Sequence, residues 1–187
     1  IQGDIKACKE LADKYKSGNS ENVKGEHFSG SVRLRNPNFA EAAKWYMKEI
    51  SLTMERGEPA PLYSLAKIAT LFHTGGYGLT RDMVKYQEFA DLVFELDNNG
   101  QGCNHLGYNL SDMYLPFVKG GRDGHRKLFS YLKQYSKEGM AEVVKCYRKA
   151  EEKGNKHAMS ELGVLYKNGW GVKKDKKEAE RLFEKAR

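Results

Sequence analysis

The sequence is poor in proline and cysteine, and it has no long apolar run. Among 187 residues there are 4 prolines but 19 glycines, a balance typical of helices separated by glycine-containing turns. No apolar stretch approaches the roughly 18 residues that a membrane-spanning helix needs, so the sequence predicts no membrane span. Apolar residues make up 40% and charged residues 30% of the chain, which favours an ordered domain over disorder.

The scarcity of cysteine argues against a disulfide framework and a zinc site. Cys8, Cys103 and Cys146 form no CxxC pair and have no histidine at a ligand spacing. At most one disulfide could form within the chain, and we expect buried free thiols. The five histidines show no metal-binding pattern either, and no phosphate-binding loop or nucleophile motif is present. The sequence therefore predicts no cofactor, no metal and no enzymatic activity.

Positive charge is concentrated in the second half of the chain. Residues 1–99 contain 13 Lys and Arg against 14 Asp and Glu, whereas residues 100–187 contain 19 against 11. A basic half favours an acidic partner. The alternative, a solvated surface rich in lysine, stays open at this point.

The clearest pattern in the sequence is a helix pair at residues 154–187. Small and apolar residues recur at helical spacing up to the turn Gly169-Trp170-Gly171-Val172, where glycine permits positive φ. Asp175 follows as a helix N-cap, with Glu178 three residues later in the position of a capping box. An apolar stripe in the last residues predicts a second helix.

The same features recur upstream, so the chain is a repeat array. A second glycine turn, Gly76-Tyr77-Gly78-Leu79, is followed by Asp82, and the Leu-x-x-x-Tyr spacing of residues 162–166 returns at Leu110 to Tyr114 and at Leu11 to Tyr15. One helix pair cannot bury its apolar face alone, so neighbouring pairs must stack. We expect helices over residues 4–17, 38–56, 60–74, 82–98, 103–117, 139–153, 156–168 and 175–186.

These residues resemble the Sel1-like repeat, a helix-pair family related to tetratricopeptide repeats. The stretch from Ala141 to Arg187 matches the family pattern most closely. The resemblance implies an all-α fold, an α/α solenoid of about four repeats whose first helices line a concave face. It also implies a non-enzymatic protein that binds other proteins.

The repeats predict one domain over residues 1–187, with units at approximately 1–57, 58–101, 102–154 and 155–187. Two insertions, at residues 19–37 and 120–138, break the period. The first is polar and contains two glycines, and we expect an irregular loop. In the second, Leu128, Tyr131, Leu132 and Tyr135 predict a short additional amphipathic helix. The insertions have either a functional role or a purely structural one, packing on their own repeats.

The candidate binding residues are those expected on the concave face and in the insertions. Tyr108 is the best candidate for an energetic hot spot, because aromatic residues dominate interface energies. Nucleic acid is disfavoured as a partner, since most aromatic residues occupy packing positions of the repeat. The complete predicted set is Lys9, Asp13, Thr70, His73, Tyr108, Asp112, Arg122, Arg126, Phe129, Lys167 and Trp170.

Within the protein-binding class, the compact array with insertions is similar to bacterial Sel1-like immunity proteins. That resemblance implies that the chain binds and neutralises a phospholipase toxin of a type VI secretion system, and it implies a location in the periplasm. The alternatives are a scaffold or adaptor in bacterial signalling or envelope regulation, with a cytoplasmic location open, and an enzyme or hydrolase factor. The sequence leaves the identity of the partner and the oligomeric state open.

Overall fold

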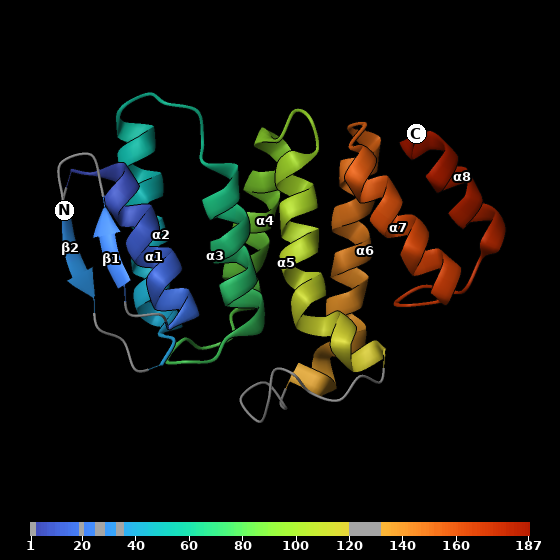
Figure 1. Ribbon diagram of the computed structural model, residues 1–187, viewed down its shortest axis with the longest axis horizontal. Coiled ribbons are helices and arrows are strands. Elements are labelled where there is room, and N and C mark those ends of the chain that lie inside the picture. Colours follow the sequence, from blue (N-terminus) through green and yellow to red (C-terminus); the bar gives the residue numbers. More distant parts are fainter. Residues whose placement is uncertain (1–2, 19–20, 25–28, 33–35, 120–131) are drawn as a thin grey trace. The chain divides into compact units, whose positions relative to one another are not determined.

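Eight helices form the core of the protein in the computed structural model, which describes residues 3–18, 21–24, 29–32, 36–119 and 132–187 (Figure 1). Each predicted helix is present with bounds shifted by no more than about one turn, so the all-α helical-repeat fold is confirmed. The helices are α1 (Ile5–Ser17), α2 (Phe39–Glu55), α3 (Leu62–Thr74), α4 (Met83–Leu96), α5 (Gln101–Val118), α6 (Ser136–Glu152), α7 (Lys156–Asn168) and α8 (Lys176–Ala186).

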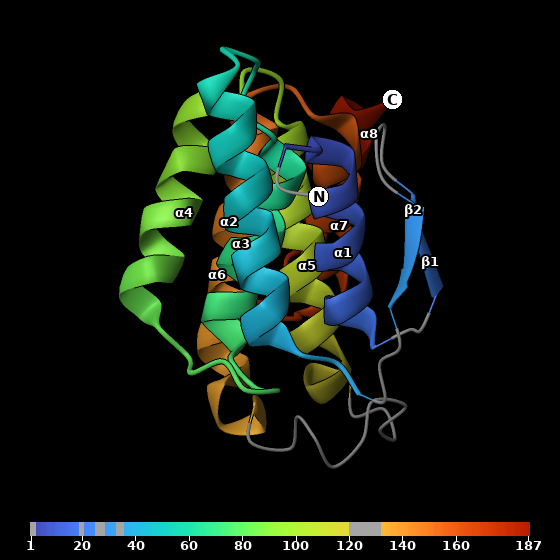
Figure 2. The same ribbon diagram turned by 90° about the vertical axis from the view of Figure 1, so that its left-hand side faces the viewer.

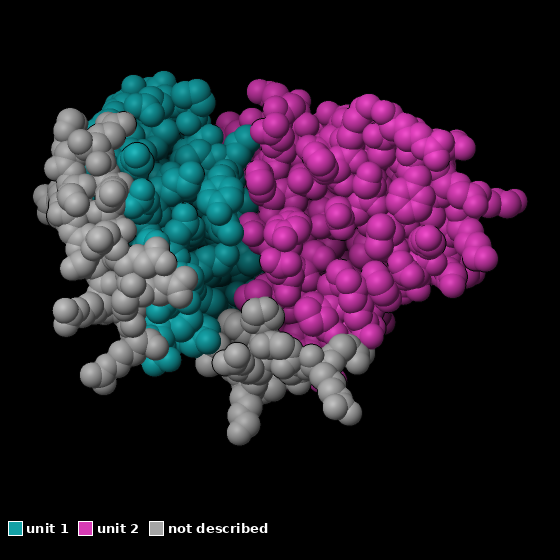
Figure 3. All heavy atoms as spheres, viewed as in Figure 1, with its two compact units in different colours: residues 1–90 teal, residues 91–187 magenta. Residues whose placement is uncertain are grey.

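The chain divides into two compact units, residues 1–90 and residues 91–187 (Figure 3). We call them unit 1 and unit 2. In unit 1, α1 packs against α2 and α2 against α3; in unit 2, α5 packs against α6, α6 against α7 and α7 against α8. The sequence predicted a single domain with a repeat boundary at residue 101, whereas the division between the compact units falls within α4.

A two-stranded hairpin corrects the expectation of an irregular loop at residues 19–37. β1 (Glu21–Lys24) pairs antiparallel with β2 (Ser29–Val32), with Glu21 opposite Val32. The hairpin lies beside α1 (Figure 2). Pairing satisfies the backbone hydrogen-bonding groups of this polar stretch, and the strands are too short and polar to show a clear period of two in sequence.

The described end of the second insertion is a turn that leads into α6. Leu132 to Tyr135 form a single 3₁₀ turn, and α6 begins directly afterwards at Ser136. Leu132 is fully buried, so the apolar pattern of this stretch reflects packing. The rest of the additional helix predicted from Leu128 and Tyr131 lies outside the described residues.

The C-terminal helix pair confirms why the repeat needs its small residues. The ring of Phe183 in α8 lies against Gly163 in α7, where an added Cβ would stand 2.7 Å from a ring carbon. Gly169 and Gly171 both have positive φ, 78° and 73°, which lets the chain turn tightly between the helices. Asp175 caps α8 by accepting hydrogen bonds from the backbone N–H groups of Lys177 and Glu178.

The cysteines behave as the sequence predicted: Cys8, Cys103 and Cys146 are free and buried. Among the described residues, none of the helices has the length and apolar character needed to cross a membrane. Within those same residues, no group of three or more histidine, cysteine or acidic side chains is placed to hold a metal ion.

Candidate protein-docking site

A pocket between α1 and α3 in unit 1 is lined mainly by charged side chains. It has a volume of about 380 Å³ and is lined by Asp13, Lys14, Lys16, Ser17 and Lys67. Three lysines therefore surround one aspartate. We call this pocket the α1–α3 groove; it contains one of the predicted site residues, Asp13.

Tyr63, at the start of α3, holds two lysines over its ring beside the groove. The ammonium nitrogens of Lys9 and Lys67 each lie 4.9 Å from the ring centroid, which is within the range of a cation–π interaction. Lys9 comes from α1 and Lys67 from α3, so the ring brings cations from two helices to one place. Lys9 is one of the predicted binding residues, and its place over Tyr63 is compatible with that prediction.

Polar contacts fix the helices behind the groove. The Tyr46 hydroxyl donates a hydrogen bond to Asp13 Oδ1 at 2.5 Å, and the Ser64 hydroxyl donates to Glu49 Oε2 at 2.6 Å. Glu49 is buried, and burial raises the pKa of its carboxyl, against the opposing effects of Ser64 and Lys9. These bonds connect α2 to both α1 and α3, so the two walls of the groove have a common support.

Thr70 and His73 do not lie on an exposed face, and the prediction for these two residues is wrong. Thr70 is 2% exposed and donates a hydrogen bond from its hydroxyl to the carbonyl of Ala66. His73 is 0% exposed. Its ring and that of Tyr86 are arranged edge to face, with 4.6 Å between their centroids. Burial, assisted by Arg81, lowers the pKa of His73 to about 3, so the imidazole is neutral and part of the core.

Tyr63 and Lys67 of α3 are half-buried, in contrast to the buried Thr70 and His73, and the sequence reasoning missed both. Lys67 is the one ionisable residue in the middle of an otherwise apolar or small stretch. Its spacing of four from Tyr63 was the available signal for the correct face.

In unit 2 the corresponding first helices, α5 and α7, present a face with acidic and aromatic groups. Tyr108 is 54% exposed, and Asp112 one turn later is exposed as well. Glu161 of α7 is exposed. The pKa of the Tyr147 hydroxyl is raised mainly by its burial, next by the negative charge of Glu161, and to a smaller extent by that of Asp112. Asp112 and Glu161 therefore lie near the same buried hydroxyl, and this face differs in charge from the α1–α3 groove.

Trp170 and Lys167 take separate places in unit 2. Trp170 is half-buried, with the Lys119 ammonium nitrogen 4.6 Å from the centroid of its ring. Lys167 lines a pocket of about 320 Å³ between α7 and α8, together with Lys176, Ala179, Glu180 and Phe183. The remaining predicted site residues, Arg122, Arg126 and Phe129, lie outside the described part of the chain.

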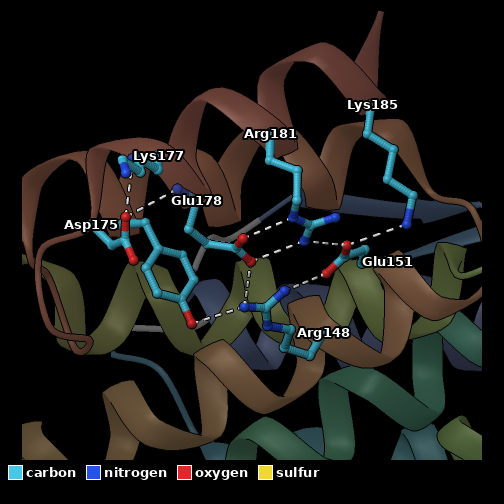
Figure 4. A network of polar contacts seen from close by, with 8 residues as sticks. Arg148, Glu151, Asp175, Lys177, Glu178, Arg181 and Lys185 are labelled. Atoms are coloured by element: carbon cyan, nitrogen blue, oxygen red, sulfur yellow. Dashed lines mark hydrogen bonds and ion pairs between the residues drawn. The ribbon is translucent and has the colours of Figure 1, made fainter.

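Many cations of unit 2 bind groups of the same unit. Arg148 of α6 donates hydrogen bonds to Glu151, to Glu178 of α8 and to the Tyr166 hydroxyl of α7, as Figure 4 shows. Arg181 bonds to both carboxylates. We call these residues, with Lys185, the Arg148 network. It ties three helices together.

The network changes the predicted role of Glu178. Its carboxylate does not close a capping box; instead Arg181, together with Arg148, lowers its pKa to about 2. For Glu151, burial opposes ionisation, but hydrogen bonds from Arg148, Arg181 and Lys185 outweigh it and lower the pKa. Glu151 and Glu178 are therefore ionised at neutral pH. The cations that bind them belong to the basic half of the chain, whose charge favoured an acidic partner in the sequence analysis.

Other lysines of unit 2 also make contacts inside the unit. The Lys153 ammonium donates to the carbonyls of Phe94 and Asp97, which end α4. The Lys149 ammonium nitrogen lies 3.0 Å from Oε2 of Glu152. Five cations of this half therefore have partners within unit 2: Arg148, Lys149, Lys153, Arg181 and Lys185.

The helix pairs define an α/α helical-repeat fold. Residues 156–187, which contain α7 and α8, match the Sel1 repeat family. The match covers the C-terminal helix pair, and stacked repeats of helix pairs present extended surfaces for binding.

Two solved structures are similar to the chain. One is a Sel1 repeat protein from Oxalobacter formigenes, with 21% sequence identity and a TM-score of 0.44 over 99% of this chain and 57% of that one. The other is c5321, a protective antigen of uropathogenic Escherichia coli with an SLR fold, with 19% identity and a TM-score of 0.24 over 99% and 54%. This chain thus spans little more than half the length of either protein. No protein of curated function matches the sequence.

Proposed function

We propose that the chain is a non-enzymatic module that binds a protein partner through the exposed faces of its first helices. The observation that carries this proposal is the α1–α3 groove, where Lys16, Ser17 and Lys67 from two helices surround a pocket of about 380 Å³. The exposed Tyr108 in unit 2 supports a second contact surface, because tyrosine is enriched among residues that contribute most to binding energy.

The narrower role that we propose is that of an immunity protein in the bacterial periplasm, which neutralises a phospholipase toxin of a type VI secretion system. It is supported by the resemblance to Sel1-like immunity proteins and by the two insertions in a short array. Fold likeness alone does not assign a function, so this role depends on its experiment. A scaffold or adaptor role in signalling or envelope regulation is the alternative outcome of that experiment.

Mixing the purified chain with the secreted effector encoded beside its gene tests the proposal. We expect co-elution of the two proteins in size-exclusion chromatography and loss of the effector's phospholipase activity. A complex with a regulatory protein in place of a toxin would leave the docking function intact and reject the immunity role. Binding to neither, with activity toward a small-molecule substrate, would reject the docking function itself.

A further inference from the structure

The described lining of the α1–α3 groove carries more positive than negative charge. Among the described residues of this lining, Asp13 is the one acidic residue, and its Oδ1 accepts the Tyr46 hydroxyl. Lys14, Lys16 and Lys67 bring three ammonium groups to the same pocket. We infer that this groove binds acidic side chains, Asp or Glu, from a segment of the partner protein. The inference rests on the proposed function, since it names the chemistry that the docking surface recognises.

The arrangement over Tyr63 gives a physical reason for an anionic ligand. Lys9 and Lys67 carry like charges, and both ammonium groups lie over the same ring at 4.9 Å from its centroid. The partner that these contacts give each ammonium group is a neutral ring, which leaves its positive charge uncompensated by that contact. A carboxylate placed beside either ammonium group would gain charge-assisted hydrogen bonds.

The lining favours a carboxylate over a phosphate. Ser17 is the last residue of α1, and the C-terminal end of a helix carries partial negative charge. Asp13 adds a full negative charge beside it. Both repel a phosphate dianion more than a carboxylate monoanion. Among the described residues of the lining there is no arginine, although bidentate arginine is the usual ligand where phosphate is recognised.

Tyr63 also supplies apolar surface for the residues that flank the acidic side chains. It is half-buried, and its ring lies beside the groove, in contact with Lys67 of the lining. A half-buried aromatic ring beside charges is a frequent anchor in protein interfaces. The groove is thus suited to an extended segment with acidic residues next to an apolar one.

Titration of the full chain with two peptides tests this inference. Each peptide has about twelve residues, a length suited to a segment bound in a groove. One peptide contains Asp and Glu, and its partner has Asn and Gln at the same places. Binding is followed by backbone amide NMR of the ¹⁵N-labelled protein. We expect saturable shift changes at Lys16, Ser17 and Lys67 with the acidic peptide, and an affinity at least about tenfold lower with the neutral one.

Charge-reversal variants locate the site. Lys67→Glu is expected to weaken the acidic peptide by about tenfold or more, because it reverses one charge of the groove. The matched control is Lys6→Glu, on the same helix as Lys16 but exposed and outside the lining, which should change the affinity by less than about twofold. Both variants keep the amide spectrum of a folded protein, which separates loss of binding from loss of fold.

Several results would overturn the inference: equal affinity for both peptides, no shift change with the acidic peptide, shift changes away from the groove, or tighter binding of an oligothymidylate at the groove. The effector complex separates this inference from the proposed function. If Lys67→Glu binds the effector as the unchanged protein does, the docking function stands and the groove assignment fails. If the acidic peptide binds as expected but no protein complex forms, the groove chemistry stands and the proposed function fails.

Discussion

The two units use their charged side chains in opposite ways. In unit 2, Arg148 and Arg181 bind the carboxylates of Glu151 and Glu178 and hold three helices together. In unit 1, the buried carboxyl of Glu49 accepts a hydrogen bond from Ser64, while lysines line a groove at the surface. A count of charge along the sequence therefore does not separate the cations that hold helices together from those that lie at the surface.

The largest expected effect is on stability and comes from Arg148→Ala in unit 2. This change removes bonds to Glu151, Glu178 and Tyr166 and leaves Glu151, which is 7% exposed, with fewer cations. We expect a loss of about 2–3 kcal/mol in the free energy of unfolding, since hydrogen bonds to charged groups of low exposure are among the strong ones.

The two tryptophans let this loss be assigned to a unit. Trp45 lies in unit 1 and Trp170 in unit 2, so Trp45→Phe leaves a fluorescence reporter for unit 2 during urea unfolding. Lys149→Ala is the control, because its ion pair with Glu152 is exposed and worth only about 0.3–0.5 kcal/mol. A loss no larger for Arg148→Ala than for this control would refute the structural role of the network.

Acid should weaken unit 2 through Glu178. Its pKa in the folded protein is about 2, against an ordinary value of 4.5, so its ionised form stabilises the fold above pH 4.5. That contribution is lost as the pH falls from 4.5 toward 2. In the Trp45→Phe background, urea midpoints measured at a series of pH values should fall more steeply than those of Glu178→Gln. Parallel curves would contradict the depressed pKa.

Glu49 in unit 1 should have the opposite dependence on pH, with a smaller effect. Burial raises its pKa in the folded protein, so folding favours the protonated form, and that stabilisation is lost as the pH rises through the folded pKa. Glu49→Gln keeps an acceptor for Ser64 without the charge. The measurement uses the Trp170→Phe background, which leaves Trp45 as the reporter of unit 1. As the pH rises, Glu49→Gln should become more stable relative to the protein that keeps Glu49. A constant difference would show that Glu49 ionises normally.

The smallest expected effect on stability comes from Lys67→Ala in the groove. The change removes one cation–π contact with Tyr63 and leaves no buried group without a partner, so the free energy of unfolding should change by less than about 0.5 kcal/mol. Measured by urea unfolding with Trp45 as the reporter, a loss above about 2 kcal/mol, as expected for Arg148→Ala, would make Lys67 structural and erase the contrast between the units.

The helices could be predicted from the sequence because their signals are local. Asp175 caps α8 with bonds to residues two and three positions later, and Gly169 ends α7 in the left-handed conformation. Such caps and turns depend on a few adjacent residues.

The faces and partners of charged groups were harder to predict. In α3 most residues are apolar or small and are buried around much of the helix, so more than one stripe fitted the pattern and Thr70 and His73 were misplaced. Glu178 meets Arg148 from 30 positions away in the sequence, and no local pattern signals such a contact. The hairpin of β1 and β2 was missed for a different reason: its strands have only four residues each.

The most direct test of the docking account compares one lysine from each unit in the same assay. Lys67 lines the groove of unit 1 and Lys167 the smaller pocket of unit 2, and both can be changed to Glu. With the acidic peptide, the account predicts that Lys67→Glu weakens binding by about tenfold or more and that Lys167→Glu changes it by less than about twofold. A larger loss with Lys167→Glu than with Lys67→Glu would place the acidic partner on unit 2 and contradict the account.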